Sequence, residues 1–117
     1  MLAVLQAKFQ PGTWMEKALL ATGDAFLLEH NSVTGRDNVW SDNHDGTGSN
    51  WLGLQLMLLR GTLNPKSSLL QWIDSQIDRN SGQPWTGSCW QAVVQEAAIV
   101  AERQRSICEV VRGIGIF

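Results

Sequence analysis

Apolar residues recur along this chain at spacings of three and four, which predicts a mainly helical fold. Helices are expected over residues 1–10, 14–22, 51–60, 64–79 and 88–111. The segment 51–60 is apolar nearly all round, so its helix is expected to be buried on most sides. The pattern therefore predicts a core built around this helix.

One short apolar run does not follow the helical spacing. Residues 25–29 lie between a Gly-Asp pair and a His-Asn pair, which is typical of a short strand. The polar residues 31–38 would then return the chain as a hairpin through Val39 and Trp40. We expect a mainly α fold with a minor short β-hairpin, in one compact helical domain over residues 1–117.

Several helix ends carry capping signals. Thr13 and Glu16 have the spacing of a capping box, in which each side chain accepts a hydrogen bond from an unpaired N–H group. Asn64 and Pro65 are residue types that favour the start of a helix. Ser49 or Asn50 could cap the helix that begins at residue 51.

Composition restricts the classes of function. The chain has 117 residues and a net charge of -2, so it offers no basic face for nucleic acid. No apolar stretch is long enough to span a membrane, and the first residues lack the pattern of a signal peptide. Cys89 and Cys108 fall in one expected helix, about 28 Å apart, too far for a disulfide. Reduced thiols predict a cytoplasmic protein.

The residues that could carry chemistry are concentrated between positions 37 and 60. A loop rich in Asp, Asn, His, Gly and Trp leads directly into the apolar helix. Gly46 and Gly48 allow tight or left-handed turns in this loop. The start of a helix also favours anionic ligand groups. We therefore expect half of any functional site here.

This region resembles the NADAR family, also called YbiA-like. The resemblance is carried by AKF near the start, ALLATGDAFLLEH, and the block from Val39 that includes HDGTG and NWLGLQLMLLR. It covers about residues 1–62 and implies a mainly helical N-glycosidase. Members hydrolyse the ribosylamine bond of early riboflavin-pathway intermediates, and some remove ADP-ribose from modified guanine. The resemblance implies no metal and no organic cofactor.

The resemblance corresponds to the second half of the family. The first half contributes a Glu-His motif whose Glu is thought to take part in catalysis, and no counterpart of it is found in this sequence. Residues 63–117 resemble nothing in the family and are expected to form a helical extension that completes the core.

The resemblance also assigns candidate site residues. Asp42 and Trp40 match pocket positions and would be catalytic, because a carboxylate stabilises the positive charge that develops on the sugar and an indole can stack on the base. The alternatives are an Asx turn at Asp42 and a core role for Trp40. The expected ligand-binding residues are Asp37, His44, Asn50, Trp51 and Arg60. Asp37 could instead cap a turn, Asn50 a helix start, and Arg60 a helix end.

A metal site is not expected from the sequence. Residues 41–46 resemble the start of a calcium loop, but Ser41 stands at its first position and Leu52 where a bidentate Glu is required. Zinc would need further His or Cys ligands near His44, and His30 is the other imidazole of the chain.

Three functions remain open. The chain could be an N-glycosidase acting on a ribosylated, phosphorylated base. It could instead bind a ribose phosphate or ADP-ribose without turnover, or be a structural remnant of the family. Uncovered apolar surface tends to be buried by association, so we expect a homodimer in which the helix 88–111 contacts its partner or the helix 51–60.

Overall fold

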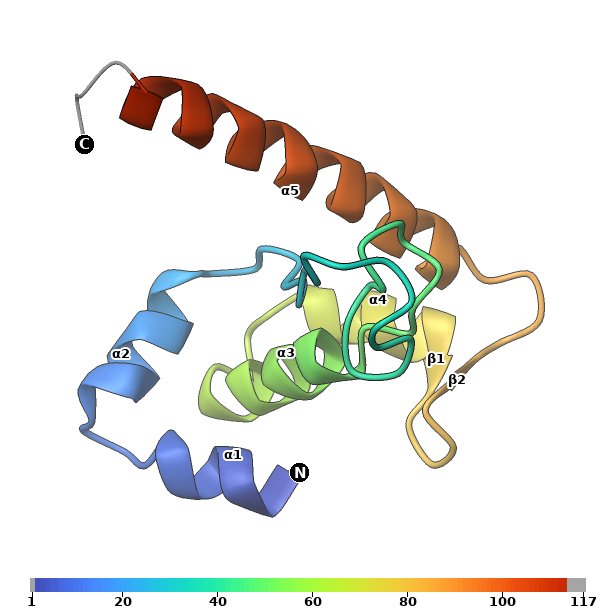
Figure 1. The fold of residues 1–117 in the computed structure, drawn as a ribbon. Helices are drawn as coiled ribbons and strands as arrows, with labels where there is room; N and C mark the ends of the chain where they lie inside the picture. Colours follow the sequence, from blue (N-terminus) through green and yellow to red (C-terminus); the bar gives the residue numbers. More distant parts are fainter. Residues whose placement is uncertain (1, 114–117) are drawn as a thin grey trace. The chain divides into compact units, whose positions relative to one another are not determined.

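The computed structural model describes the backbone of residues 2–113 and the side chains of residues 4–104 (Figure 1). The chain divides into two compact units. Met1–Leu27 and Trp51–Ser88 form one, here called the helical unit; Leu28–Asn50 and Cys89–Phe117 form the other, here called the loop unit. None of the helices in the described part of the chain is long and apolar enough to cross a membrane.

The helical unit is organised around α3. Its helices are α1 (Leu2–Lys8), α2 (Trp14–Ala21), α3 (Trp51–Leu63) and α4 (Leu69–Gln76). The helices α1, α2 and α4 all contact α3 (Figure 1). Residues 51–61 are all buried or partly buried, as their apolar pattern predicted. Leu5, Leu19 and Leu59 form the centre of one apolar cluster that joins α1, α2 and α3.

The predicted capping box at α2 is present. The Thr13 hydroxyl accepts a hydrogen bond from the N–H of Glu16 at 3.2 Å. The Glu16 carboxylate accepts one from the N–H of Gly12 at 2.6 Å. Gly23 follows the helix with φ of 62°, a backbone conformation that glycine adopts at little cost.

The hairpin expected at residues 25–40 is not formed. Residues 25–30 are extended but belong to no strand. The N–H of Glu29 bonds to a side chain instead, donating to Oδ1 of Asn50 at 3.0 Å. In the described part of the chain, a hairpin pairs β1 (Ile77–Asp78) with β2 (Gln83–Pro84), antiparallel, with Ile77 opposite Pro84. Strands of two residues are too short to show an alternating pattern in the sequence.

The helix expected from residue 64 begins later, at Leu69. The N–H of Asn64 still donates to the carbonyl of Arg60, so Asn64 terminates α3. The carbonyl of Asn64 accepts a hydrogen bond from the N–H of Ser67 and closes a turn. Asn64 and Pro65 therefore form the connection between two helices rather than the start of the second.

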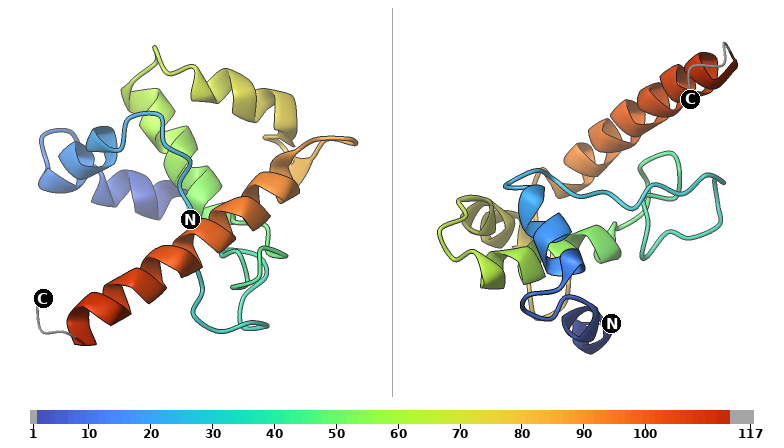
Figure 2. Two further views of the ribbon diagram at one scale, coloured as in Figure 1. Left: turned by 90° about the horizontal axis from the view of Figure 1, so that it is seen from above. Right: turned by 90° about the vertical axis from the view of Figure 1, so that its left-hand side faces the viewer.

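The loop unit pairs an irregular segment with one long helix. The segment 28–50 turns back on itself beside the first turns of α5 (Trp90–Gly113) (Figure 2). Trp90, Val94 and Ala98 are buried on one face of α5. Cys108, for which a reduced thiol is expected, lies outside the described side chains. The prediction of a single domain stays a prediction.

Candidate functional site

The loop 37–50 is closed by the backbone of Asp42. The N–H of Asp42 donates to the carbonyl of Glu29 at 2.9 Å. Its carbonyl accepts hydrogen bonds from the N–H groups of Gly46 and Gly48 at 2.9 and 3.0 Å. A Cβ atom on Gly48 would lie 2.1 Å from the carbonyl oxygen of Ser41, so only glycine fits there. These bonds fix Asp42 at the centre of the loop.

Two residues after Asp42 have left-handed backbone conformations. Asn43 has φ of 60° and His44 has φ of 72°. This region is uncommon for residues other than glycine, although Asn and His adopt it more often than most. The reversal of the chain brings the His44 ring back to the segment at residues 30–31, where its Nδ1 lies 2.8 Å from the carbonyl oxygen of Asn31.

The helix α5 holds this loop through its first residues. The indole N–H of Trp90 donates to the carbonyl of Ser49 at 3.1 Å. The side-chain amide of Gln91 donates to the carbonyls of Gly46 and Gly48 at 2.6 and 2.9 Å. Glu102 lies about three turns further along the same helix. The contacts at the start of α5 therefore determine where Glu102 lies.

Asp42, His30 and Glu102 form a continuous chain of side chains. Oδ2 of Asp42 lies 2.5 Å from Nδ1 of His30, and Nε2 of His30 lies 3.0 Å from Oε2 of Glu102. The side chain of Asp42 is fully buried, that of His30 is 17% exposed and that of Glu102 is 41% exposed. The chain thus leads from a buried carboxylate, through an imidazole, to a carboxylate that reaches solvent.

Both carboxylate oxygens of Asp42 have hydrogen-bond partners. Its other oxygen, Oδ1, accepts hydrogen bonds from the N–H groups of Asn31 and His44 at 2.9 and 2.8 Å. The bond to His44 is an Asx turn, one of the two roles weighed for this residue. Because the carboxylate is buried and bonded on both oxygens, Asp42 can influence a ligand only through His30.

His30 lies between two carboxylates, which favour its charged form. Partial burial lowers its pKa, but the hydrogen bonds that His30 makes to Asp42 and Glu102 and the charges of both carboxylates raise it more. The net result is a pKa above the usual value of 6.5. The protonated imidazolium is therefore stabilised between the two carboxylates.

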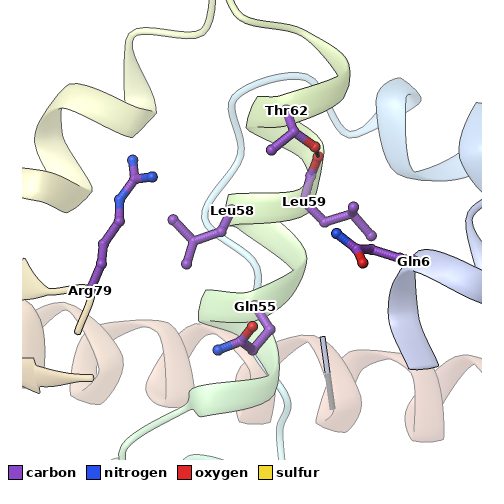
Figure 3. A pocket seen from close by; sticks show the side chains of 6 residues that line it. All are labelled: Gln6, Gln55, Leu58, Leu59, Thr62 and Arg79. Carbon is purple, nitrogen blue, oxygen red and sulfur yellow. Dashed lines mark hydrogen bonds between the residues drawn. The ribbon is translucent and has the colours of Figure 1, made fainter. Parts of the chain in front are cut away.

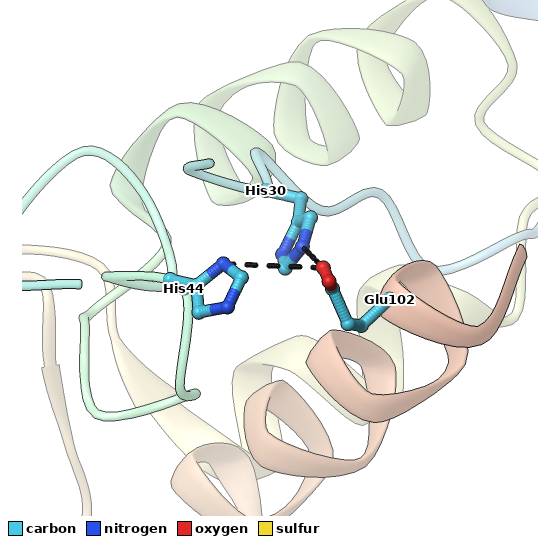
Figure 4. Close-up of side chains that lie close together, drawn as sticks. All are labelled: His30, His44 and Glu102. Carbon is cyan, nitrogen blue, oxygen red and sulfur yellow. Dashed lines mark hydrogen bonds and ion pairs between the residues drawn. The ribbon is translucent and has the colours of Figure 1, made fainter. Parts of the chain in front are cut away.

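His44 lies against the same cluster (Figure 4). Its ring stacks on that of His30 with centroids 5.1 Å apart. Its Nδ1 lies 3.9 Å from Oε2 of Glu102. The predicted ligand-binding residue His44 and the predicted catalytic residue Asp42 are therefore brought together with His30 and Glu102.

The remaining predicted residues of the loop unit hold the loop. Oδ1 of Asp37 accepts hydrogen bonds from the N–H groups of Val39 and Trp40, both at 3.0 Å. Asp37 therefore caps a turn, which was the alternative to its role in ligand binding. Trp40 is partly exposed. Asn50 is fully buried with φ of 54°, and its Oδ1 holds the extended segment at Glu29.

Trp51 and Arg60 belong to the helical unit. The indole N–H of Trp51 donates to the carbonyl of Gly82 at 3.1 Å. Arg60 is 2% exposed and donates to the Thr22 hydroxyl and the Ala25 carbonyl, both at 2.7 Å. Burial lowers the pKa of Arg60. The guanidinium therefore ties the end of α2 to α3, and its predicted ligand role stays a prediction.

The helical unit also contains a cavity of about 290 Å³. Its lining comes from α1, α3 and the hairpin turn: Gln6, Gln55, Leu58, Leu59, Thr62 and Arg79 (Figure 3). The guanidinium of Arg79 is paired with Asp74, at 2.5 and 3.1 Å. None of the predicted site residues lines this cavity.

Sequence reasoning missed two members of the cluster. Glu29 and His30 form a Glu-His pair in the sequence, but the pair does not align with the Glu-His motif of the family. Glu102 follows Trp90, Val94 and Ala98 at steps of four, so a carboxylate continues the buried face of α5. That interruption of an apolar stripe was the available signal for Glu102.

Comparison with known proteins supports the resemblance described above. The sequence is 40% identical to a riboflavin biosynthesis protein of Vibrio vulnificus over 74 residues. These residues make up 62% of this chain and 19% of the Vibrio protein. Over 59 residues, 50% of this chain, it is 44% identical to N-glycosidase YbiA of Escherichia coli and of Shigella flexneri, and covers 35% of each. No family model matches the chain, and no solved structure matches it significantly.

The matched stretch spans about a third of YbiA and about a fifth of the Vibrio protein. The identity is nevertheless far above that of unrelated sequences. Over about half of its length, this chain is homologous to riboflavin biosynthesis and YbiA-type N-glycosidase proteins of the NADAR family.

Proposed function

We propose that this chain is an N-glycosidase that hydrolyses the N-glycosidic bond of a ribosylated, phosphorylated base. The observation that carries the proposal is the chain of side chains from Asp42 through His30 to the partly exposed carboxylate of Glu102. The relatives named N-glycosidase YbiA support the reaction class. An early riboflavin intermediate or an ADP-ribose adduct fits the proposed substrate class.

In this proposal Glu102 is the catalytic carboxylate. Cleavage of the bond between C1 of the ribose and the base nitrogen leaves positive charge on the sugar, which a nearby carboxylate stabilises. Water then adds to C1; its proton passes to Glu102, and the departing nitrogen takes a proton from solvent. The products are the free base and the ribose phosphate.

Asp42 and His30 are positioning residues for Glu102. The buried Asp42 fixes the His30 ring, and Nε2 of His30 holds Oε2 of Glu102 at 3.0 Å. Trp40, partly exposed in the same unit, retains its predicted role of stacking on the base. The predicted homodimer and the cytoplasmic location also stay predictions.

The proposal predicts release of ribose phosphate from a ribosylaminopyrimidine phosphate. Glu102→Gln keeps the shape of the side chain but removes its charge, and we expect the rate to fall about 10²- to 10⁴-fold. Asp42→Asn is expected to lower kcat more than it raises KM, because Asp42 orients the cluster. The assay is a chromatographic measurement of free ribose phosphate in the presence of a chelator.

Glu96→Gln is the matched control, since Glu96 is an exposed carboxylate on the same helix. It should retain the wild-type rate. Release by wild type that is unchanged in Glu102→Gln would contradict the role of Glu102. Absence of release, with binding of the substrate detected by calorimetry, would establish the alternative of a ribose-phosphate or ADP-ribose binding module. Neither release nor binding would leave the structural alternative.

A further inference from the structure

Three potential metal ligands meet in the loop unit. His30, His44 and Glu102 each offer one ligand atom, and these atoms lie within 4.8 Å of one another (Figure 4). The three residues come from the extended segment, the loop and α5. The two that lie furthest apart in the sequence, His30 and Glu102, are separated by 72 positions. Such a convergence of two imidazoles and one carboxylate cannot be predicted from sequence spacing.

His30 is oriented in the way that metal-binding histidines require, and His44 is held by a backbone carbonyl. A histidine that ligates a metal almost always donates its other ring N–H to a carboxylate or a backbone carbonyl. Nδ1 of His30 contacts the carboxylate of Asp42 at 2.5 Å, which leaves Nε2 directed at Glu102. Nδ1 of His44 contacts the carbonyl of Asn31 at 2.8 Å. Both rings are therefore held by polar partners outside the cluster.

The exposure of the cluster suits an ion that enters from solvent. The side chains of His30 and His44 are 17% and 26% exposed, and that of Glu102 is 41% exposed. The ligand atoms are thus partly sheltered, with an open side. Two neutral imidazoles, one carboxylate and an open position form the set found in zinc sites that retain a bound water.

The ligand types also indicate which metals fit. Imidazole nitrogen favours zinc and its neighbours in the first transition series, whereas calcium and magnesium require more oxygen ligands than one carboxylate supplies. Binding of a divalent cation would also offset the negative charge of Asp42 and Glu102.

We propose that His30, His44 and Glu102 bind a divalent transition metal ion, Zn²⁺ by preference, with Asp42 orienting His30. The inference does not rest on the proposed N-glycosidase function. If both hold, a bound ion would occupy the Glu102 carboxylate that hydrolysis needs, and Zn²⁺ would inhibit release of ribose phosphate.

The test is calorimetric titration of the untagged full chain with ZnCl₂ at neutral pH. Cys89→Ser and Cys108→Ser are introduced first, so that thiolates do not bind the metal. We expect one Zn²⁺ per chain, and a Co²⁺ absorption spectrum typical of four or five nitrogen and oxygen ligands. Glu102→Gln, a change at a partly exposed side chain, should weaken binding at least about 10- to 100-fold.

Two further variants separate a ligand role from a structural one. His44→Asn removes the imidazole but keeps a residue type that tolerates φ of 72°, and it should also lose binding. Glu96→Gln should bind Zn²⁺ as the parent does. The proposal would be overturned by a parent chain that binds no stoichiometric Zn²⁺, or by Glu102→Gln and His44→Asn variants that bind with parental affinity and spectrum.

Discussion

Asp42→Ala is expected to destabilise the loop unit by about 3–5 kcal/mol, the range for removing one partner of a buried charged pair. The substitution removes a fully buried carboxylate that accepts hydrogen bonds from the backbone of Asn31 and His44 and contacts Nδ1 of His30. Three polar groups would lose this acceptor. Hydrogen exchange of peptides from residues 28–50, followed with urea, measures the loss of stability in this unit.

Asp42→Asn is the control for this prediction. Its side-chain oxygen can still accept from the two backbone N–H groups, so the loss of stability should be much smaller than for alanine. Equal protection of residues 28–50 in wild type and Asp42→Ala would show that the loop does not depend on this carboxylate.

The second large effect is expected from Gly48→Ala, at about 3 kcal/mol of lost stability, the upper part of the usual range for overpacking. An added Cβ would lie 2.1 Å from the carbonyl oxygen of Ser41 and 2.7 Å from the carbonyl carbon of Asp42. Both are backbone atoms of the turn that holds Asp42, so the clash cannot be relieved by a side-chain rotation. The same hydrogen-exchange measurement reports the result.

Gly35→Ala distinguishes the clash from backbone strain. Gly35 has φ of 85° in the same unit, and nothing lies within 4 Å of a Cβ built on it. Its substitution should cost only the strain of a left-handed residue, about 1–2 kcal/mol. If Gly48→Ala were no more destabilising than Gly35→Ala, the close approach at Gly48 would be disproved.

Three features of the helices were predictable because local rules specify them. The capping box at Thr13, the apolar helix from Trp51 and the long final helix all follow from residue spacing. The hairpin was placed wrongly because the run at residues 25–29 has strand composition, whereas side chains such as Asn50 supply its hydrogen bonds. Long-range polar contacts of this kind leave no periodic signal.

The candidate site was predictable only in part, for a similar reason. Asp42 and His44 stand out in a loop rich in polar residues, and the family resemblance selects them. Their chemistry depends on His30 and Glu102, which lie 12 and 60 positions from Asp42 in the sequence. Left-handed residues in the loop and the contacts of Trp90 and Gln91 bring these groups together. The pattern of polar and apolar residues in the sequence predicts neither the left-handed backbone nor these contacts.

The pH dependence of the loop unit follows from the raised pKa of His30. A raised pKa means that the folded state holds the proton more tightly than the unfolded state. The resulting stabilisation is complete below the unfolded pKa of about 6.5 and is lost as the pH rises through the higher folded pKa. The two carboxylates that flank His30 are the physical cause.

The most direct test of the cluster is therefore an NMR titration of the His30 ring protons in metal-free protein, with a chelator present. His30 is expected to titrate above 6.5, and Glu102→Gln is expected to lower its pKa while Glu96→Gln does not. A His30 that titrates at or below 6.5 and is indifferent to Glu102→Gln would contradict the chain from Asp42 through His30 to Glu102, on which the proposed chemistry depends.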